Sequence, residues 1–394
     1  MFFKGFWKIT KSTRSFLINF SPKTIKKPIL LNMLLLRSPP ILTKLARNFH
    51  KIALTQPNIL NQQVEKVDPY SKIKINSQIN VKIRPYNVLE CQDSNLLRAT
   101  IRSAVDGKPS KAQLDVKIKN KNVEITSKTT STGKEAEELV CLLEVPIRAD
   151  LLIDTESEVS IADMYCEELN VISNKNIDTK NVRSTTVDLF SKNGNINCNG
   201  LLLGQKINIK TNTNGSIFLD KLQGDSINCH TIDGNIKTNS CYVESSKFTT
   251  DNGTLDLKNI HKTSEVCVNK MGDLFMTGVH GNIQIKCNGG GNVNVQLSEI
   301  VGNNKIVTQT EDNVIINISD QIEETSFIEA TSKKFTLDES LSHLSDCIEN
   351  DNHFRMSKEQ DNCNKLVIES KGNLILGKLS WADSMKIAMG LKEI

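Results

Sequence analysis

Apolar and polar residues alternate in short segments from about residue 156 to residue 318, and the alternation restarts at a fixed interval. Each full restart carries a glycine followed two positions later by an apolar residue. The six complete copies begin with "NGNINC" (193), "NGSIFL" (214), "DGNIKT" (233), "NGTLDL" (252), "MGDLFM" (271) and "GGNVNV" (290). They are separated by 21, 19, 19, 19 and 19 residues. A fixed period near twenty residues is typical of a solenoid.

Each copy predicts a short strand with one buried and one solvent-facing side, because its apolar residues recur at every second position. In the third copy Ile236 and Thr238 share the buried side, and Lys237 lies between them on the outer side. A second alternating segment, such as "SINCH" at 226, lies about midway through each period, so we expect two strands and two corners per coil. An Asn-Gly pair also signals a β-hairpin. The constant spacing of like residues instead favours parallel stacking of coils at about 4.8 Å.

The glycines of the six copies are predicted to form the corners of the coils. A sharp corner needs a positive φ angle, which glycine adopts without steric cost. These structural glycines are Gly194, Gly215, Gly234, Gly253, Gly272 and Gly291. The motif continues without its glycine at "NKNIDT" (174) and "EDNVII" (311), and it returns at "KGNLIL" (371).

The remaining segments are predicted to close the two ends of the solenoid, because open ends expose strand edges and apolar core. The predicted segments are a leader (1–64), a β-rich N-terminal cap (65–150), the repeats (151–337), an acidic polar insertion or loop (338–363), and strands of the last coil with a short helical lid (364–394). Ser380 is a candidate N-cap for the helix of that lid.

Residues 1–64 contain eleven Lys and Arg residues and no Asp or Glu. This composition predicts a mitochondrial presequence, disordered and followed by a linker, and therefore a mitochondrial location, in the matrix. Met33 could act as an internal start. The apolar run 29–36 leaves a secretory signal open as the alternative, and it is too short to span a bilayer, so no transmembrane segment is expected.

Beyond the leader the chain carries 38 basic and 45 acidic residues, a net charge of −7. Nucleic-acid binding needs a basic face, so we expect no nucleic-acid partner. The composition, 38% hydrophobic and 5% aromatic, suits a β protein of short strands. The ten cysteines contain no C-x-x-C pair, so they are expected to be reduced, buried side chains and not zinc ligands.

The segment "VPIRADLLIDTESEVSIADM" (145–164), with the x-G-N-I-x-I strands that follow it, resembles a bacterial adhesin-type β-solenoid family, sometimes called head-GIN-like, whose function is unknown. With the import-like leader and the closing "GKLSW" (377–381), the chain looks like the animal, mitochondrial branch of that family. The likeness covers about 145–379. It implies an all-β, right-handed parallel β-helix with coils of about 19 residues, and it supplies no catalytic residues.

Known catalytic motifs of hydrolases, metalloproteases and nucleotide-binding enzymes are missing from the sequence. His261 and His280 are the one histidine pair in repeat register, and stacking would place them about 5 Å apart. They are a candidate metal-binding pair, but a third ligand is missing. We therefore predict no metal and no cofactor.

The outward positions after the glycines form a candidate binding face. It consists of three asparagines, one lysine, two aspartates and two phenylalanines: Asn195, Asn197, Phe218, Asn235, Lys237, Asp256, Asp273 and Phe275. The sequence thus predicts a non-enzymatic scaffold with a protein partner. Two alternatives remain open. One is a β-helix hydrolase or lyase acting on carbohydrate through Asp256 and Asp273, and the other is a secreted adhesion protein glycosylated at Asn214 or Asn252.

Overall fold

The structure is a computed structural model in which residues 57–394 form one compact unit. It describes residues 58–87, 95–103, 112–131, 137–356 and 364–380, together with 382, 383 and 386. The predicted presequence and the Met33 start lie outside the described residues, apart from the last few residues of the linker. Most of the predicted C-terminal lid lies outside them as well.

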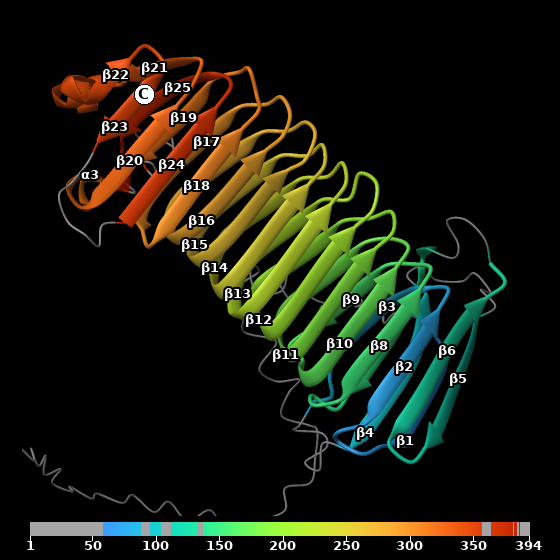
Figure 1. Cartoon of the computed structure of the whole chain (residues 1–394). Coiled ribbons are helices and arrows are strands. Elements are labelled where there is room, and N and C mark those ends of the chain that lie inside the picture. Colours follow the sequence, from blue (N-terminus) through green and yellow to red (C-terminus); the bar gives the residue numbers. More distant parts are fainter. Residues whose placement is uncertain are drawn as a thin grey trace, which may run out of the picture. The chain divides into compact units, whose positions relative to one another are not determined.

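The centre of this unit is a stack of parallel coils (Figure 1). Six long strands each follow the outline of one coil: β11 (Ile177–Ser191), β12 (Ile196–Thr211), β13 (Ile217–Thr231), β14 (Ile236–Thr250), β15 (Leu255–Val268) and β16 (Leu274–Cys287). Neighbours pair in parallel with like residues aligned, as in Ile217 with Ile236 and Ile236 with Leu255. The predicted all-β parallel solenoid is therefore confirmed.

Each coil has three faces, one more than the two strands that the sequence predicts. In β14 the first face begins at Ile236, the narrow face lies around Tyr242, and the third face ends at Thr250. The narrow face buries one apolar row, made of Val182, Leu202, Leu222, Cys241, Ile260, Val279 and Leu297. Because each coil contributes so few residues to this face, no alternation is long enough to reveal it in the sequence.

In the described part of the chain, ten strands precede the long coils. They are β1 (Asn58–Lys66), β2 (Lys72–Ser77), β3 (Asn80–Pro85), β4 (Leu96–Ser103), β5 (Ala112–Lys119), β6 (Asn122–Thr129), β7 (Leu139–Val145), β8 (Asp150–Thr155), β9 (Val159–Ala162) and β10 (Tyr165–Ser173). The coil formed by β2 and β3 pairs with β8 and β9 on one side and with β6 and β7 on the other. It is thus threaded between strands that come later in the chain. Antiparallel β1, β4 and β5 close this end.

The far end has the same arrangement. Its elements are β17 (Val293–Ile300), β18 (Asn303–Thr308), β19 (Val314–Ile318), α3 (Asp320–Thr325), β20 (Ser326–Thr331), β21 (Lys334–Leu337), the 3-10 helix η1 (Glu339–Cys347), β22 (Ile348–Asn350), β23 (His353–Met356), β24 (Asn364–Ser370) and β25 (Asn373–Lys378). The coil of β24 and β25 lies between β18 and β19 on one side and β20 and β21 on the other. Among the described strands, β24 and β25 therefore come last in sequence but lie inside the coil of β20 and β21 in space.

Part of the segment expected to be an acidic loop is folded against this end. Leu341 of η1 and Phe354 of β23 are fully buried, and β23 pairs with β20 antiparallel. Beyond β25, Ser380 Oγ accepts a hydrogen bond from the backbone N–H of Asp383, at 3.1 Å, which is the geometry of an N-cap. Among the described residues no helix has both the length and the apolar character needed to cross a membrane.

The corner glycines share a requirement that differs from the predicted positive φ angle. Of the six, only Gly272 and Gly291 have a positive φ, of 152° and 133°. At Gly234 an added Cβ would overlap the carbonyl oxygen of Gly215 in the coil below, and the same clash with a preceding backbone recurs at the other five. The corners therefore require glycine because successive backbones pack in contact there.

Candidate functional site

The structure places all eight residues of the predicted binding face on the first face, in two neighbouring rows. The row farther from the corner contains Asn197, Phe218, Lys237, Asp256 and Phe275 on successive coils. Asn195, Asn235 and Asp273 lie one residue after the glycines, in the row beside the corner.

The row beside the corner is used to join the coils. The side-chain oxygens of Asn195, Asn235 and Asp273 each accept the backbone N–H of the next coil, from Ser216, Thr254 and Asn292 respectively, at 2.8 Å in all three cases. Net contributions near 1 kcal/mol are typical of such bonds. This corner ladder stabilises the stack and leaves fewer acceptors for a ligand.

In the row farther from the corner, two aromatic rings flank an ion pair. Lys237 Nζ lies 3.3 Å from Asp256 Oδ2, and Phe218 and Phe275 are their neighbours on either side. Phe275 is 39% exposed. We call Phe218, Lys237, Asp256 and Phe275 the phenylalanine strip. Its four side chains stand on successive coils at a spacing of about 4.8 Å.

The two carboxylates proposed for hydrolysis are both engaged within the chain. Asp256 pairs with Lys237, and Asp273 Oδ1 accepts both the backbone N–H of Asn292, at 2.8 Å, and its side-chain amide, at 3.3 Å. These contacts give each carboxylate a structural partner. The geometry therefore gives no support to an acid and base pair at Asp256 and Asp273.

The histidine pair lies on the narrow face. The rings of His261 and His280 stack with centroids 4.8 Å apart and an interplanar angle of 3°, and Tyr242 stacks on His261 at 4.3 Å. In two parallel stacked rings the nitrogen lone pairs point in parallel planes. The two imidazoles therefore cannot both direct a lone pair at one ion at metal–nitrogen distances near 2 Å. Among the described residues no three His, Cys, Asp or Glu side chains form a group that could hold a metal. Burial, and after it the neighbouring His280, lower the pKa of His261.

The thiols belong to the core. Eight cysteines are free in the described part of the chain, and six of them are buried. Burial raises the pKa of Cys198 to about 12 and that of Cys166 to about 11. A thiol held neutral in this way is a packing residue and a poor nucleophile.

A row of buried hydroxyls behind the corners was missed in the sequence. Thr231 Oγ1 accepts the N–H of Gly234 at 3.1 Å and donates to the carbonyl of Gly215 at 2.9 Å. Ser191, two coils earlier, and Thr250, in the next coil, form the same bridge. A Ser or Thr three residues before the corner glycine is the signal that could have revealed this row.

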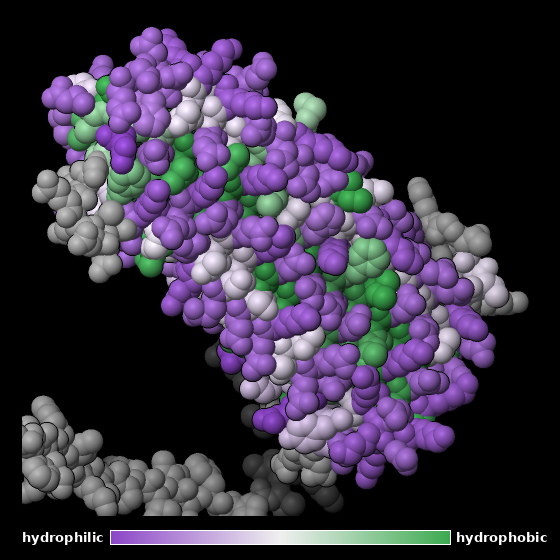
Figure 2. Space-filling view, in the orientation of Figure 1, coloured by the Kyte–Doolittle hydropathy of each residue, from purple (hydrophilic) through white to green (hydrophobic). Residues whose placement is uncertain are grey.

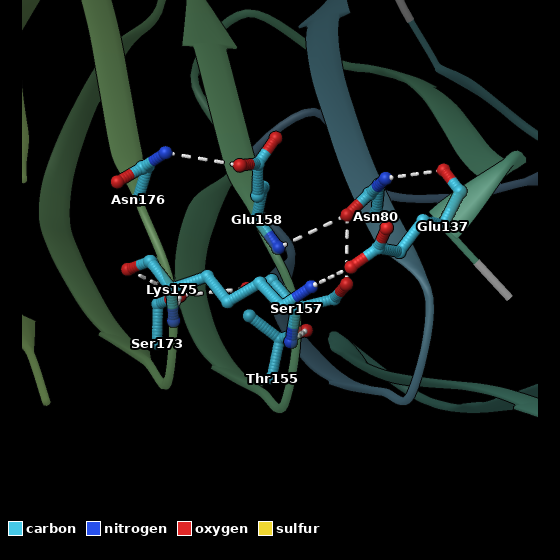
Figure 3. A network of polar contacts seen from close by, with 8 residues as sticks. All are labelled: Asn80, Glu137, Thr155, Ser157, Glu158, Ser173, Lys175 and Asn176. Atoms are coloured by element: carbon cyan, nitrogen blue, oxygen red, sulfur yellow. Dashed lines mark hydrogen bonds and ion pairs between the residues drawn. The ribbon is translucent and has the colours of Figure 1, made fainter. Parts of the chain in front are cut away.

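Similar side-chain hydrogen bonds between coils continue into the N-terminal cap (Figure 3). Asn80 Oδ1 accepts the Ser157 hydroxyl at 2.7 Å and the backbone N–H of Glu158 at 3.1 Å. Asn176 Nδ2 then donates to the Glu158 carboxylate at 2.9 Å. The threaded coil of β2 and β3 is therefore joined to the repeats by the ladder that the repeats use among themselves.

The third face is mainly hydrophilic in the view of Figure 2, with small apolar patches. Near the N-terminal end its half-buried outward residues include Leu152, Ile172 and Phe190. Farther along, a shallow hollow of about 510 Å³ is lined by residues that include Lys247 and Glu265, whose charged groups lie 2.7 Å apart. These features are too shallow and too well paired to define a catalytic pocket.

No protein-family model matches the chain. Solved structures that are similar to it include a putative adhesin from Parabacteroides distasonis, with 10% identity, 82% of this chain and 98% of that chain covered, and a TM-score of 0.35. Another is a putative adhesin from Parabacteroides merdae, with 11% identity, 80% and 95% coverage, and a TM-score of 0.33. With scores this low, the fold assignment rests on the strand register described above.

Proposed function

We propose that the chain is a non-enzymatic β-solenoid scaffold that binds a protein partner through the phenylalanine strip. The observation that carries this proposal is the row of two aromatic rings around the ion pair of Lys237 and Asp256 on a flat sheet face. Aromatic residues are enriched at the centre of protein interfaces. The corner ladder beside the strip holds its backbone in place, so little conformational entropy is lost when a partner binds.

Two features support a mitochondrial location for this scaffold. The segment 1–64 is basic and free of acidic residues, and six of the eight described cysteines are buried free thiols. Unpaired core thiols suit a reducing compartment.

The proposal can be tested with a photo-crosslinking amino acid at position 275 of the full chain, expressed in cells. We expect one reproducible adduct, found in the mitochondrial fraction and lost when Phe218→Ala is added. The matched control places the crosslinker at position 210, where Lys210 is exposed on the third face. Equal capture from both positions, or an adduct insensitive to Phe218→Ala, would contradict binding through the strip. An adduct confined to the secreted fraction would contradict only the location.

A further inference from the structure

The narrow face carries a single outward row of mainly planar side chains along ten successive coils. We call it the planar row, and it consists of Tyr70, Arg148, Tyr165, Arg183, Leu203, Gln223, Tyr242, His261, His280 and Glu299. Three of the four tyrosines in the chain lie in this row. Tyrosine and arginine are the residue types, with tryptophan, that most often dominate the energetics of protein interfaces.

The planar row is ordered by stacking at both ends. The Arg148 guanidinium lies between two rings, 5.7 Å from the centroid of Tyr70 and 5.6 Å from that of Tyr165, and it donates to Tyr70 Oη at 3.2 Å. At the other end Tyr242, His261 and His280 form a continuous stack. Neighbouring coils cover the ring faces, so the polar ring edges are the part that faces solvent. Ordering these side chains in advance lowers the entropy lost when a partner binds.

The two ends of the row carry opposite charge. Arg148 and Arg183 lie in its N-terminal half, and neither guanidinium forms an ion pair within the described part of the chain. Glu299 ends the row, and α3, with the exposed Glu324, takes the place of the narrow face in the next coil. Eight coil steps separate Arg148 from Glu299, a distance of roughly 40 Å.

We infer that a second copy of this chain docks antiparallel on the planar row, so that the positive end of each copy meets the negative end of the other. A two-fold axis at Gln223 would set Arg148 against Glu299 of the second copy. The same axis would set Leu203 against Tyr242 and Tyr165 against His280. Since a two-fold interface uses the same patch on both copies, each of these contacts forms twice.

The size of the row predicts a weak, reversible dimer. A strip about 40 Å long and one to two side chains wide buries on the order of 1,000 Å² in total, at the low end for specific interfaces. The dimer leaves the first face of both copies open and so would carry two phenylalanine strips. This inference does not depend on the proposed function of that strip.

Charge reversal tests the inference in the full chain by sedimentation velocity over a roughly hundredfold range of concentration. Arg148→Glu and Glu299→Arg should each weaken dimerisation by about tenfold or more, because each places like charges together twice. The double variant should restore the dimer. The two residues are too far apart to touch within one copy, so restoration can arise only between copies. Lys192→Glu, an exposed charge at a corner away from the row, is the matched control.

Far-UV circular dichroism checks that each variant is folded. If a reversal at Arg148 or Glu299 impairs folding, Gln223→Arg provides a second test, since it sets two guanidinium groups against each other on the two-fold axis and should abolish the dimer. A chain that stays monomeric at every concentration would overturn the inference. So would a dimer that persists in Gln223→Arg, or single reversals that the double variant fails to rescue.

Discussion

At many positions of this solenoid, packing against the preceding coil restricts the residue type as much as the residue's own backbone conformation does. Gly234 illustrates this, because its φ angle is ordinary and its missing side chain is what lets Gly215 approach. Left-handed φ angles near 50° to 70° occur at a different corner, where Asn181, Gly200 and Asn259 have values of 51°, 68° and 50°. Asparagine tolerates that conformation better than most residues, which explains its presence there.

Gly234→Ala should destabilise the protein by about 1 to 3 kcal/mol, because the new methyl group forces two corner backbones apart. Urea unfolding monitored by circular dichroism measures the change. Gly290→Ala is the control, since an added Cβ there meets only Asp312 Oδ2, at 3.9 Å. Equal effects at the two glycines would refute the packing explanation.

At the scale of elements, the sequence predicted the repeated strands. It did not predict the short narrow face or the hydrogen bonds between coils. The alternation around Ile236 was long enough to reveal the first face, whereas the narrow face of the same coil buries only Cys241 and Val243, on either side of Tyr242. The residues of the candidate binding face lie together on the first face. The hydrogen bonds that these residues make could not be predicted from the sequence. Whether the Asn235 side chain is bonded depends on the position of the Thr254 backbone N–H in the next coil.

The C-terminal cap is held by a small polar cluster that joins three elements. Glu323 of α3 lies 2.7 Å from His343 Nε2 of η1 and 2.9 Å from Lys378 Nζ of β25, and Lys378 also pairs with Asp320. Burial raises the pKa of Glu323, but its contacts with His343 and Lys378 outweigh burial and hold the pKa below its ordinary value of 4.5.

Acid should therefore loosen this cap. A carboxyl whose pKa is lowered by folding stabilises the fold above the unfolded pKa and loses that contribution as the pH falls through the folded value, here below 4.5. Glu323→Gln should lower the stability of the cap by about 1 to 2 kcal/mol at neutral pH. The stability of this variant should also depend less on pH in the acid range. Amide hydrogen exchange in α3 and η1 measures this. Glu324→Gln, its exposed neighbour, is the control, and an identical pH profile for both variants would contradict the assignment.

At the scale of the whole compact unit, both ends are closed by threading a coil out of sequence order. The coil of β24 and β25 supplies partners to β18 and β19 on one side and to β20 and β21 on the other. Removing it would free strand edges on both sides at once. Exposed edges of this kind promote association with other chains.

A chain ending at residue 363 should therefore unfold at a clearly lower temperature than the full chain and aggregate on heating. Thermal unfolding with light scattering measures both effects. A chain ending at residue 380 retains β24 and β25 and is the matched control, for which we expect little change. Similar melting of the two truncated chains would show that the threaded coil is dispensable.

Threading also sets an order in time for a chain that emerges from the ribosome, or passes through a membrane channel, with its N-terminus first. When β20 to β23 have been synthesised, the position between them and the coil of β18 and β19 is still empty. Only residues 364–378 can fill this position. At the N-terminal end, β2 and β3 must likewise wait for strands made up to eighty residues later. The repeats can grow coil by coil, but neither end can be sealed early. The unfinished chain therefore exposes open β edges until residues 364–378 arrive, and it is during this interval that a chaperone would have most to protect.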